Sequence, residues 1–247
     1  MQGLYTIQNI VLSCDVAIRP MKGILILLLL IVTAALPVII VFFWFRAAKS
    51  TVTLPWFLTS LTAGIVSLLF AVLFQNFFPL PGTIGLWSVF FGVFIRIALV
   101  EETSRLVSLI PLLSVSKLRR NLDERFCASL GLVSGLGFAM MESAFYGLSD
   151  INIILFRAIT AAPLHGACSI RVGAAFFIAG KHPLRALFLF VSAVLIHGAY
   201  NLMIINPILP SILAVPIAFA AFFASVHFIQ STKEDDENSF ISKSPLS

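Results

Sequence analysis

Long apolar runs, separated by short polar connections, make up most of the chain. A helix that crosses the hydrocarbon core of a bilayer needs about 20 consecutive, mostly apolar residues. Runs of this kind occupy residues 23–45, 54–74, 84–113, 126–148, 152–179, 184–204 and 207–229. The pattern therefore predicts an all-α protein, a polytopic transmembrane helix bundle of about seven spans.

The two ends of the chain differ from this central region. Residues 1–22 form an N-terminal segment, which we interpret either as a helix in the membrane interface or as an extra short span over 4–18, giving about eight spans. The first long run exceeds a cleaved signal sequence in length, so we interpret it as a retained span. Residues 23–229 would form the transmembrane domain, and we expect residues 230–247 to be a disordered polar tail.

Composition supports a membrane protein. The 247 residues are 60% hydrophobic and 11% charged, whereas a soluble domain carries roughly 25% charged residues. The net charge of +5 includes no basic patch interleaved with aromatic residues, so the lipid bilayer and not nucleic acid is the expected partner. The cysteines are scattered and form no CxxC pair, which argues against a disulfide framework or a zinc ribbon.

Lysine and arginine are unevenly distributed among the connections. Basic residues occur near 46–53, 114–125 and 180–185 and in the tail, and none occur near 75–83, 149–151 and 205–206. Because basic connections face the cytoplasm in most membrane proteins, the pattern predicts a multi-pass protein of the cell membrane with a cytoplasmic C-terminus. Arg19 and Lys22 would then lie outside, a discrepancy that a short span at 4–18 would remove.

The third apolar run contains a cluster of charges, within the sequence LVEETSRLVSLIP of residues 99–111. A charged side chain at the centre of a membrane helix costs about 2.5–3.5 kcal/mol on insertion scales, so it persists when paired or facing water. Glu101 and Glu102 precede Arg105 by four and three residues, so one arginine can hold both carboxylates close together. Taken alone, these residues fit a structural ion pair or a proton relay as well as a catalytic site.

Three further runs carry ionisable residues in the apolar zone. Glu142 lies in the fourth run. The fifth carries Arg157 and His165 on nearly the same helix face, and the sixth carries His197 and Asn201, four residues apart. The glycines near them are Gly131, Gly135, Gly137, Gly147, Gly166, Gly173 and Gly198. Because glycine permits close approach of membrane helices, we expect a tight bundle around one shared polar centre.

The order and spacing of these residues resembles the PrsW family of intramembrane proteases, within the wider group that includes the CAAX prenyl endopeptidases. The resemblance covers about residues 84–205. It rests on Glu101 through Arg105, Phe138 through Glu142, Arg157 with Pro163 and His165, and His197 through Asn201. The CAAX enzymes typically have one more residue between the paired glutamates and the arginine, and Asn in place of Glu142. Both differences favour the PrsW branch.

The resemblance implies hydrolysis of peptide bonds by an activated water. Either Glu101 or Glu102, working with His165, would activate the water. His197 and Asn201 would bind the developing oxyanion. Arg105 would keep the second glutamate ionised, and Glu142 would orient a histidine or the water. The expected catalytic residues are thus Glu101, Glu102, Glu142, His165 and His197, with Arg105, Arg157 and Asn201 in support.

The last expectations concern a metal ion, the substrate and the alternative functions. His165, His197 and a carboxylate could ligate zinc, but there is no HExxH motif and the ligands would come from different helices. The resemblance implies a glutamate-dependent mechanism without an obligatory metal, so we favour a mechanism without a cofactor. The resemblance implies a membrane-anchored protein as substrate. The alternatives from other classes are a catalytically silent membrane scaffold of the same fold and a transporter with a buried ion or proton site.

Overall fold

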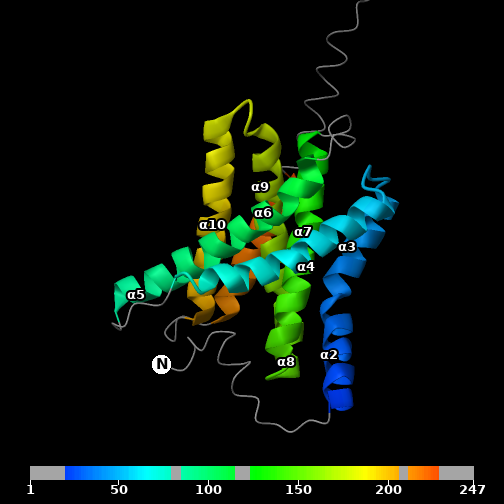
Figure 1. Ribbon diagram of the computed structural model, residues 1–247, viewed down its shortest axis with the longest axis vertical. Coiled ribbons are helices and arrows are strands. Elements are labelled where there is room, and N and C mark those ends of the chain that lie inside the picture. The colour runs from blue at the N-terminus through cyan, green and yellow to red at the C-terminus, as the bar shows by residue number, and fades with distance from the viewer. Residues whose placement is uncertain (1–19, 79–84, 115–122, 206–210, 228–247) are drawn as a thin grey trace, which may run out of the picture.

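The computed structural model describes residues 20–78, 85–114, 123–205 and 211–227 (Figure 1). All regular structure in these residues is helical, without a β-strand, which confirms the all-α prediction for the described part of the chain. The interpretations of 4–18 as an interfacial helix or short span and of 230–247 as a tail concern residues outside this part.

The first predicted run forms two helices with a bend between them. α2 spans Pro20–Ala34 and α3 spans Leu36–Ala47, and the pair is bent by 44°. Pro37 lies in the first turn of α3. A proline cannot donate a backbone hydrogen bond, and its ring collides with the carbonyl one turn earlier, which accounts for the bend at this point.

The third predicted run is a continuous helical segment whose pitch changes along its length. α5 (Leu86–Phe90) leads into η1 (Phe91–Leu99), a stretch of π-helix, and α6 (Val100–Ser114) follows directly. In η1 the backbone N–H of Val100 donates to the carbonyl of Ile95, five residues earlier. The wider turn shifts the faces of α6 relative to α5, and α6 carries the paired glutamates.

The fifth predicted run is interrupted at Thr160. α8 spans Ile151–Ile159 and α9 spans Ala161–Ile178. Pro163 cannot donate to the carbonyl of Ile159, and the hydroxyl of Thr160 donates to the carbonyl of Phe156 at 2.9 Å. α8 and α9 together still have the length and composition of one membrane span.

Glycines bring the central helices into backbone contact. α7 (Glu124–Gly147) lies at the centre of the molecule, and 94% of its apolar 18-residue stretch is buried. A Cβ atom on Gly131 of α7 would overlap the carbonyl oxygen of Ser169 in α9, and one on Gly173 would overlap that of Cys127. The expectation of a tight bundle is therefore confirmed at the crossing of α7 and α9.

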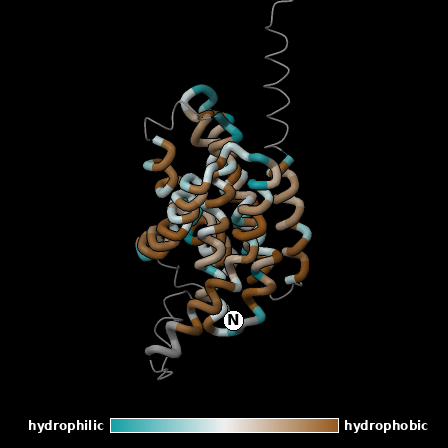
Figure 2. The backbone as a smooth tube through the Cα atoms, turned by 90° about the vertical axis from the view of Figure 1, so that its right-hand side faces the viewer, coloured by the Kyte–Doolittle hydropathy of each residue, from teal (hydrophilic) through white to brown (hydrophobic). Residues whose placement is uncertain are grey.

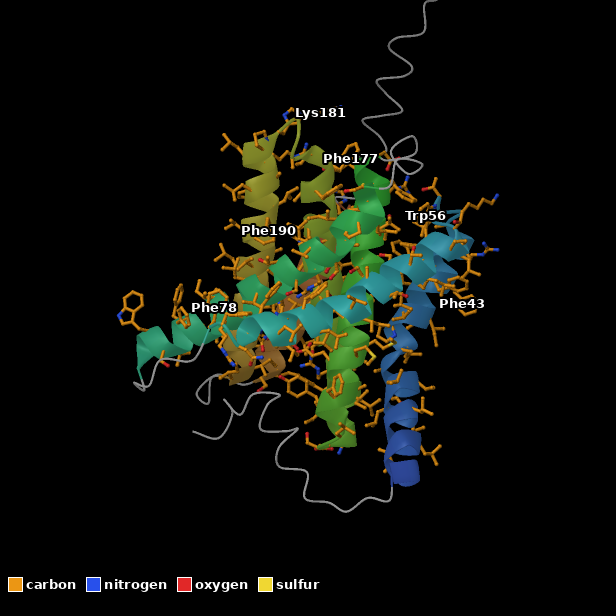
Figure 3. All side chains as sticks on the ribbon, viewed as in Figure 1. Phe43, Trp56, Phe78, Phe177, Lys181 and Phe190 are labelled. Atoms are coloured by element: carbon orange, nitrogen blue, oxygen red, sulfur yellow. The ribbon has the colours of Figure 1, made fainter. Side chains whose placement is uncertain are left out.

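The remaining helices surround this pair. α10 (Pro183–Ile205) stands beside α9, and α4 (Leu54–Gln75) runs along α6 and crosses α7 at a large angle (Figure 1). The helices are largely hydrophobic along their length (Figure 2), and many large hydrophobic side chains are exposed on them. Phe43, which points away from α3 in Figure 3, is 64% exposed. An apolar exterior around buried charges suits a protein surrounded by lipid.

The number of spans is confirmed only in part. Four helical segments in the described residues are long and apolar enough to cross a membrane, and a fifth is added if the bent pair α2 and α3 counts as one span. The segment formed by α5, η1 and α6 carries Arg96 in addition to the charges near residue 101, and the last described helix, Ser211–His227, is shorter. The prediction of seven or eight spans therefore stays open for these two segments.

Candidate active site

Ionisable side chains from five helices meet in the interior of the bundle. α6 contributes Glu101, Glu102 and Arg105, α7 contributes Glu142, α8 contributes Arg157, α9 contributes His165, and α10 contributes His197. The carboxylates and imidazoles among them are at most 8% exposed. Charged groups are tolerated at such burial when each one is paired or hydrogen-bonded.

The first group of contacts joins α6 to α10. A guanidinium nitrogen of Arg105 lies 2.8 Å from Oε1 of Glu102, and Nδ1 of His197 lies 2.7 Å from the same oxygen. Arg105 also donates to the hydroxyl of Ser169 at 3.3 Å and stacks over the ring of Phe138, 4.6 Å from its centroid. Glu102 is therefore the glutamate that Arg105 holds, and it fixes the orientation of His197.

The second group of contacts joins α7, α8 and α9. Oε2 of Glu142 accepts from Arg157 at 2.5 Å and lies 2.9 Å from Nε2 of His165. Arg157 also donates to the hydroxyl of Ser143 at 3.1 Å, and its guanidinium lies 4.4 Å from the ring centroid of Tyr146. Each histidine thus has one ring nitrogen bound to a carboxylate that an arginine holds in turn.

Glu101 lies between these two groups. Its Oε2 is 3.6 Å from Nε2 of His197 and 3.7 Å from Arg105. This oxygen, like Oε2 of Glu102, has no hydrogen-bond partner among the described residues. Nδ1 of His165 is likewise without a hydrogen-bond partner in the described part of the chain. The imidazole rings of His165 and His197 lie 4.9 Å apart, nearly perpendicular.

The residues of this centre fit a metal ion. Glu101, His165 and His197 each offer one ligand atom, and these atoms lie within 4.8 Å of one another. Two histidines and one carboxylate form a known ligand set of catalytic zinc. Metal-binding histidines usually donate their other ring N–H to a carboxylate, as Glu102 and Glu142 allow here. Zinc binding by His165 and His197 is therefore chemically possible.

The charge balance of the centre also favours a bound cation. The centre contains the carboxylates of Glu101, Glu102 and Glu142. The guanidinium groups of Arg105 and Arg157 offset only two of these three negative charges. With both imidazoles neutral, a buried centre with one excess negative charge favours a bound proton or a cation.

The structure brings together seven of the eight residues expected from the sequence. Asn201 is the exception: it lies one turn after His197 on α10, is half-buried, and makes no hydrogen bond to the described residues of the centre. Sequence reasoning missed Ser143, Tyr146 and Ser169 as partners of the two arginines. The signal for Ser169 was its position one helical turn after His165.

The fold and the centre define a helical membrane protein with a buried glutamate–histidine site. The chain belongs to the PrsW family: the family model described as PrsW family intramembrane metalloprotease matches residues 52–227. No curated protein and no solved structure matches the chain significantly. Membership confirms the first part of the resemblance and makes the protein a membrane peptidase that acts on membrane proteins, whereas the wider grouping with the CAAX enzymes stays a resemblance.

Proposed function

We propose that this protein is an intramembrane endopeptidase that hydrolyses peptide bonds of membrane-anchored proteins at the centre formed by Glu101, His165 and His197. The observation that carries the proposal is the convergence of one ligand atom from each of these three residues. Two atoms of the same residues, Glu101 Oε2 and His165 Nδ1, have no hydrogen-bond partner among the described residues. In a purely structural ion pair, these atoms would form hydrogen bonds within the cluster. An enzyme leaves them available for a metal ion, a water or a substrate.

The unpaired atoms favour a bound zinc ion over the cofactor-free mechanism that the sequence alone favoured. Glu101, His165 and His197 would hold the ion. When bound, zinc lowers the pKa of a water ligand and polarises a carbonyl group. The centre meets the needs of such an ion, since it combines two neutral nitrogen donors with a carboxylate donor and an excess negative charge.

The protein's own residues prepare this centre. An ionised Glu102 accepts the proton on Nδ1 of His197, which leaves Nε2 of that ring with a free lone pair. Glu142 does the same for Nε2 of His165 and leaves Nδ1 free. Arg105 and Arg157 keep the two supporting glutamates ionised and in place.

The remaining roles in the reaction belong to Glu101 and Asn201. Glu101 is the only glutamate of the three whose carboxylate has no pairing arginine at hydrogen-bond distance within the described residues, since Arg105 lies 3.7 Å from it. In metal-loaded protein this carboxylate would serve as a ligand of the ion; without the ion, it would take a proton from water and pass it to the leaving amine. Asn201, one turn from His197, would donate to the oxyanion once a substrate is bound.

The substrate and the membrane orientation follow from the surroundings. A centre buried between apolar helices is reached by a chain that is itself anchored in the bilayer, so the substrate is a membrane-anchored protein. The basic connections support a multi-pass protein of the cell membrane with its C-terminus in the cytoplasm.

The direct test is cleavage of a membrane-anchored reporter by the full-length protein reconstituted in vesicles. We expect Glu101→Gln to abolish cleavage while the protein stays folded. Glu124→Gln is the matched control, because Glu124 lies in the first turn of α7 and pairs with the half-exposed Arg185 at 3.2 Å; it should cleave like the wild type.

Metal content gives a second measurement that does not depend on activity. We expect purified protein to carry about one zinc ion per chain by mass spectrometry, and His165→Ala and His197→Ala to lose it. Cleavage that is unchanged in Glu101→Gln would contradict the proposal as a whole. Full cleavage by protein free of metal would restrict the mechanism to glutamate and histidine alone.

A further inference from the structure

Arg96 is a buried charge that the active centre does not use. It lies in η1, is 7% exposed, and its Nε has no hydrogen-bond partner among the described residues. No described carboxylate lies within ion-pair distance of it, whereas Arg105 and Arg157 each pair with a glutamate. An unpaired ionisable group inside a membrane protein marks a functional site in most cases, because its burial is costly.

Arg96 lies on the face of η1 that turns into the bundle. Gly92, Val93 and Val100, at spacings of three and four residues from it, are buried as well, while the residues directly beside it are half-buried. A lipid phosphate approaches a helix from its exposed side. A group that reaches Arg96 from the interior belongs to a chain that has entered the bundle.

η1 also lies beside the turn of α10 that carries His197. A Cβ atom on Gly198, the next residue, would overlap the ring of Phe94 in η1. Arg96 precedes Glu101 by five residues, or about 7.5 Å along a helix axis. An extended peptide advances about 3.3 Å per residue. Arg96 is thus placed for a substrate side chain about two or three residues from the bond that is cut.

We propose that Arg96 binds an acidic side chain of the substrate and thereby selects where the substrate is cut. The inference rests on the proposed function of the centre. A guanidinium group presents two parallel N–H donors to a carboxylate, and the bond is strong where water is excluded. The π-helical turn in which Arg96 lies is a feature frequently found at functional sites. The preferred substrates would carry Asp or Glu on one side of the cleaved bond.

The test uses the full-length protein in vesicles of phosphatidylcholine and reporters that differ only in having Asp, Asn or Lys at one position near the cut. For the wild type we expect the Asp reporter to be cleaved at least about tenfold faster than the Asn reporter at one position, two or three residues from the cut. Arg96→Gln should remove this preference. Arg96→Glu should transfer it to the Lys reporter at the same position.

Arg171→Gln is the matched control. Arg171 is a half-buried arginine of α9 whose partners are neutral, the hydroxyl of Ser225 and the carbonyl of Ala167. Its substitution should leave the ratio of Asp to Asn cleavage unchanged. Arg96→Lys, which keeps the charge, should retain part of the preference and provides the comparison if Arg96→Gln does not fold.

The outcomes separate the inference from the function on which it rests. An Asp to Asn ratio that is equal in the wild type, Arg96→Lys and Arg96→Glu would overturn the role of Arg96. So would an effect that depends on added phosphatidylglycerol instead of reporter charge, because it would indicate a lipid phosphate as the ligand. Failure of the wild type to cleave any reporter, or equal cleavage by Glu101→Gln, would overturn the proposed function and the inference with it.

Discussion

Two adjacent glutamates have different environments in this protein. Glu102 contacts Arg105 at 2.8 Å and His197 at 2.7 Å, whereas Glu101 lies farther from both, at 3.7 Å and 3.6 Å. Residues three and four positions before an arginine are both within its reach on a helix. His197 of α10 makes the difference between the two glutamates, because it binds Glu102 and not Glu101 at hydrogen-bond distance. We infer that Glu102 supports the centre and that Glu101 reacts.

Substitution of each glutamate by glutamine should separate these two roles. Glu102→Gln leaves the fully buried Arg105 without its closest carboxylate, and removing one partner of a buried ion pair costs about 3 kcal/mol or more of folding free energy. Glu101→Gln should abolish cleavage and, with both proteins free of metal, leave the unfolding temperature close to that of the wild type. Thermal unfolding in detergent and reporter cleavage would be measured on both variants. The reverse pattern would exchange the roles assigned to the two residues.

Arg157 should affect binding of the proposed zinc ion through Glu142 and His165. Arg157→Met removes the partner that holds Glu142, so His165 loses its fixed orientation. Losing a supporting group of this kind lowers metal affinity by about 10–100-fold. Zinc affinity, measured by competition with a chelator, should fall by this amount, and Arg157→Lys should recover part of it. An unchanged affinity in Arg157→Met would show that Glu142 is held without the arginine.

At the scale of helices, the distance between α7 and α9 decides whether the two groups of contacts can meet. α7 carries Glu142 and α9 carries His165, and their backbones touch at Gly131 and Gly173. α8, which precedes α9 across the break at Thr160, carries the Arg157 that contacts Glu142. Helix packing therefore sets the geometry of the centre several turns away from it.

Gly131→Ala should destabilise the protein although alanine favours helices. The new Cβ atom would overlap the carbonyl oxygen of Ser169, a backbone atom that cannot rotate away. Overpacking of this kind costs about 1–3 kcal/mol, which exceeds the gain of about 1 kcal/mol in helix propensity. Gly180→Ala is the control, since nothing lies within 4 Å of a Cβ atom there. Equal unfolding temperatures in the two variants would contradict a close contact between α7 and α9.

At the scale of the whole molecule, the sequence predicted where the helices lie because each needs an uninterrupted apolar run. It did not predict the bend before Pro37, the break at Thr160 or the π-helical stretch η1. The two prolines were visible signals, whereas the π-helical pitch depends on contacts with other helices. Spacing likewise identified most residues of the centre, but the pairing of each arginine with one glutamate depends on side chains brought in by other helices.

The orientation of the whole bundle is the last prediction. Ser149 follows α7, and Lys181 lies in the turn between α9 and α10 at the opposite end of the molecule (Figures 1 and 3). Since basic connections face the cytoplasm, a cysteine at Ser149 should react with a water-soluble thiol reagent from outside intact cells, and one at Lys181 only after the cells are opened. Cys14 would first be replaced by serine, whereas Cys127 and Cys168 are fully buried.

The same experiment fixes the side from which substrates are cut. Glu142 lies five residues before the end of α7 at Gly147, or about 7.5 Å from the end that Ser149 follows. The centre is therefore nearer to the outer face if Ser149 is labelled from outside, and we expect cleavage of substrates close to that face. Labelling of Lys181→Cys in intact cells, with Ser149→Cys protected, would invert the bundle and move the cut to the cytoplasmic side.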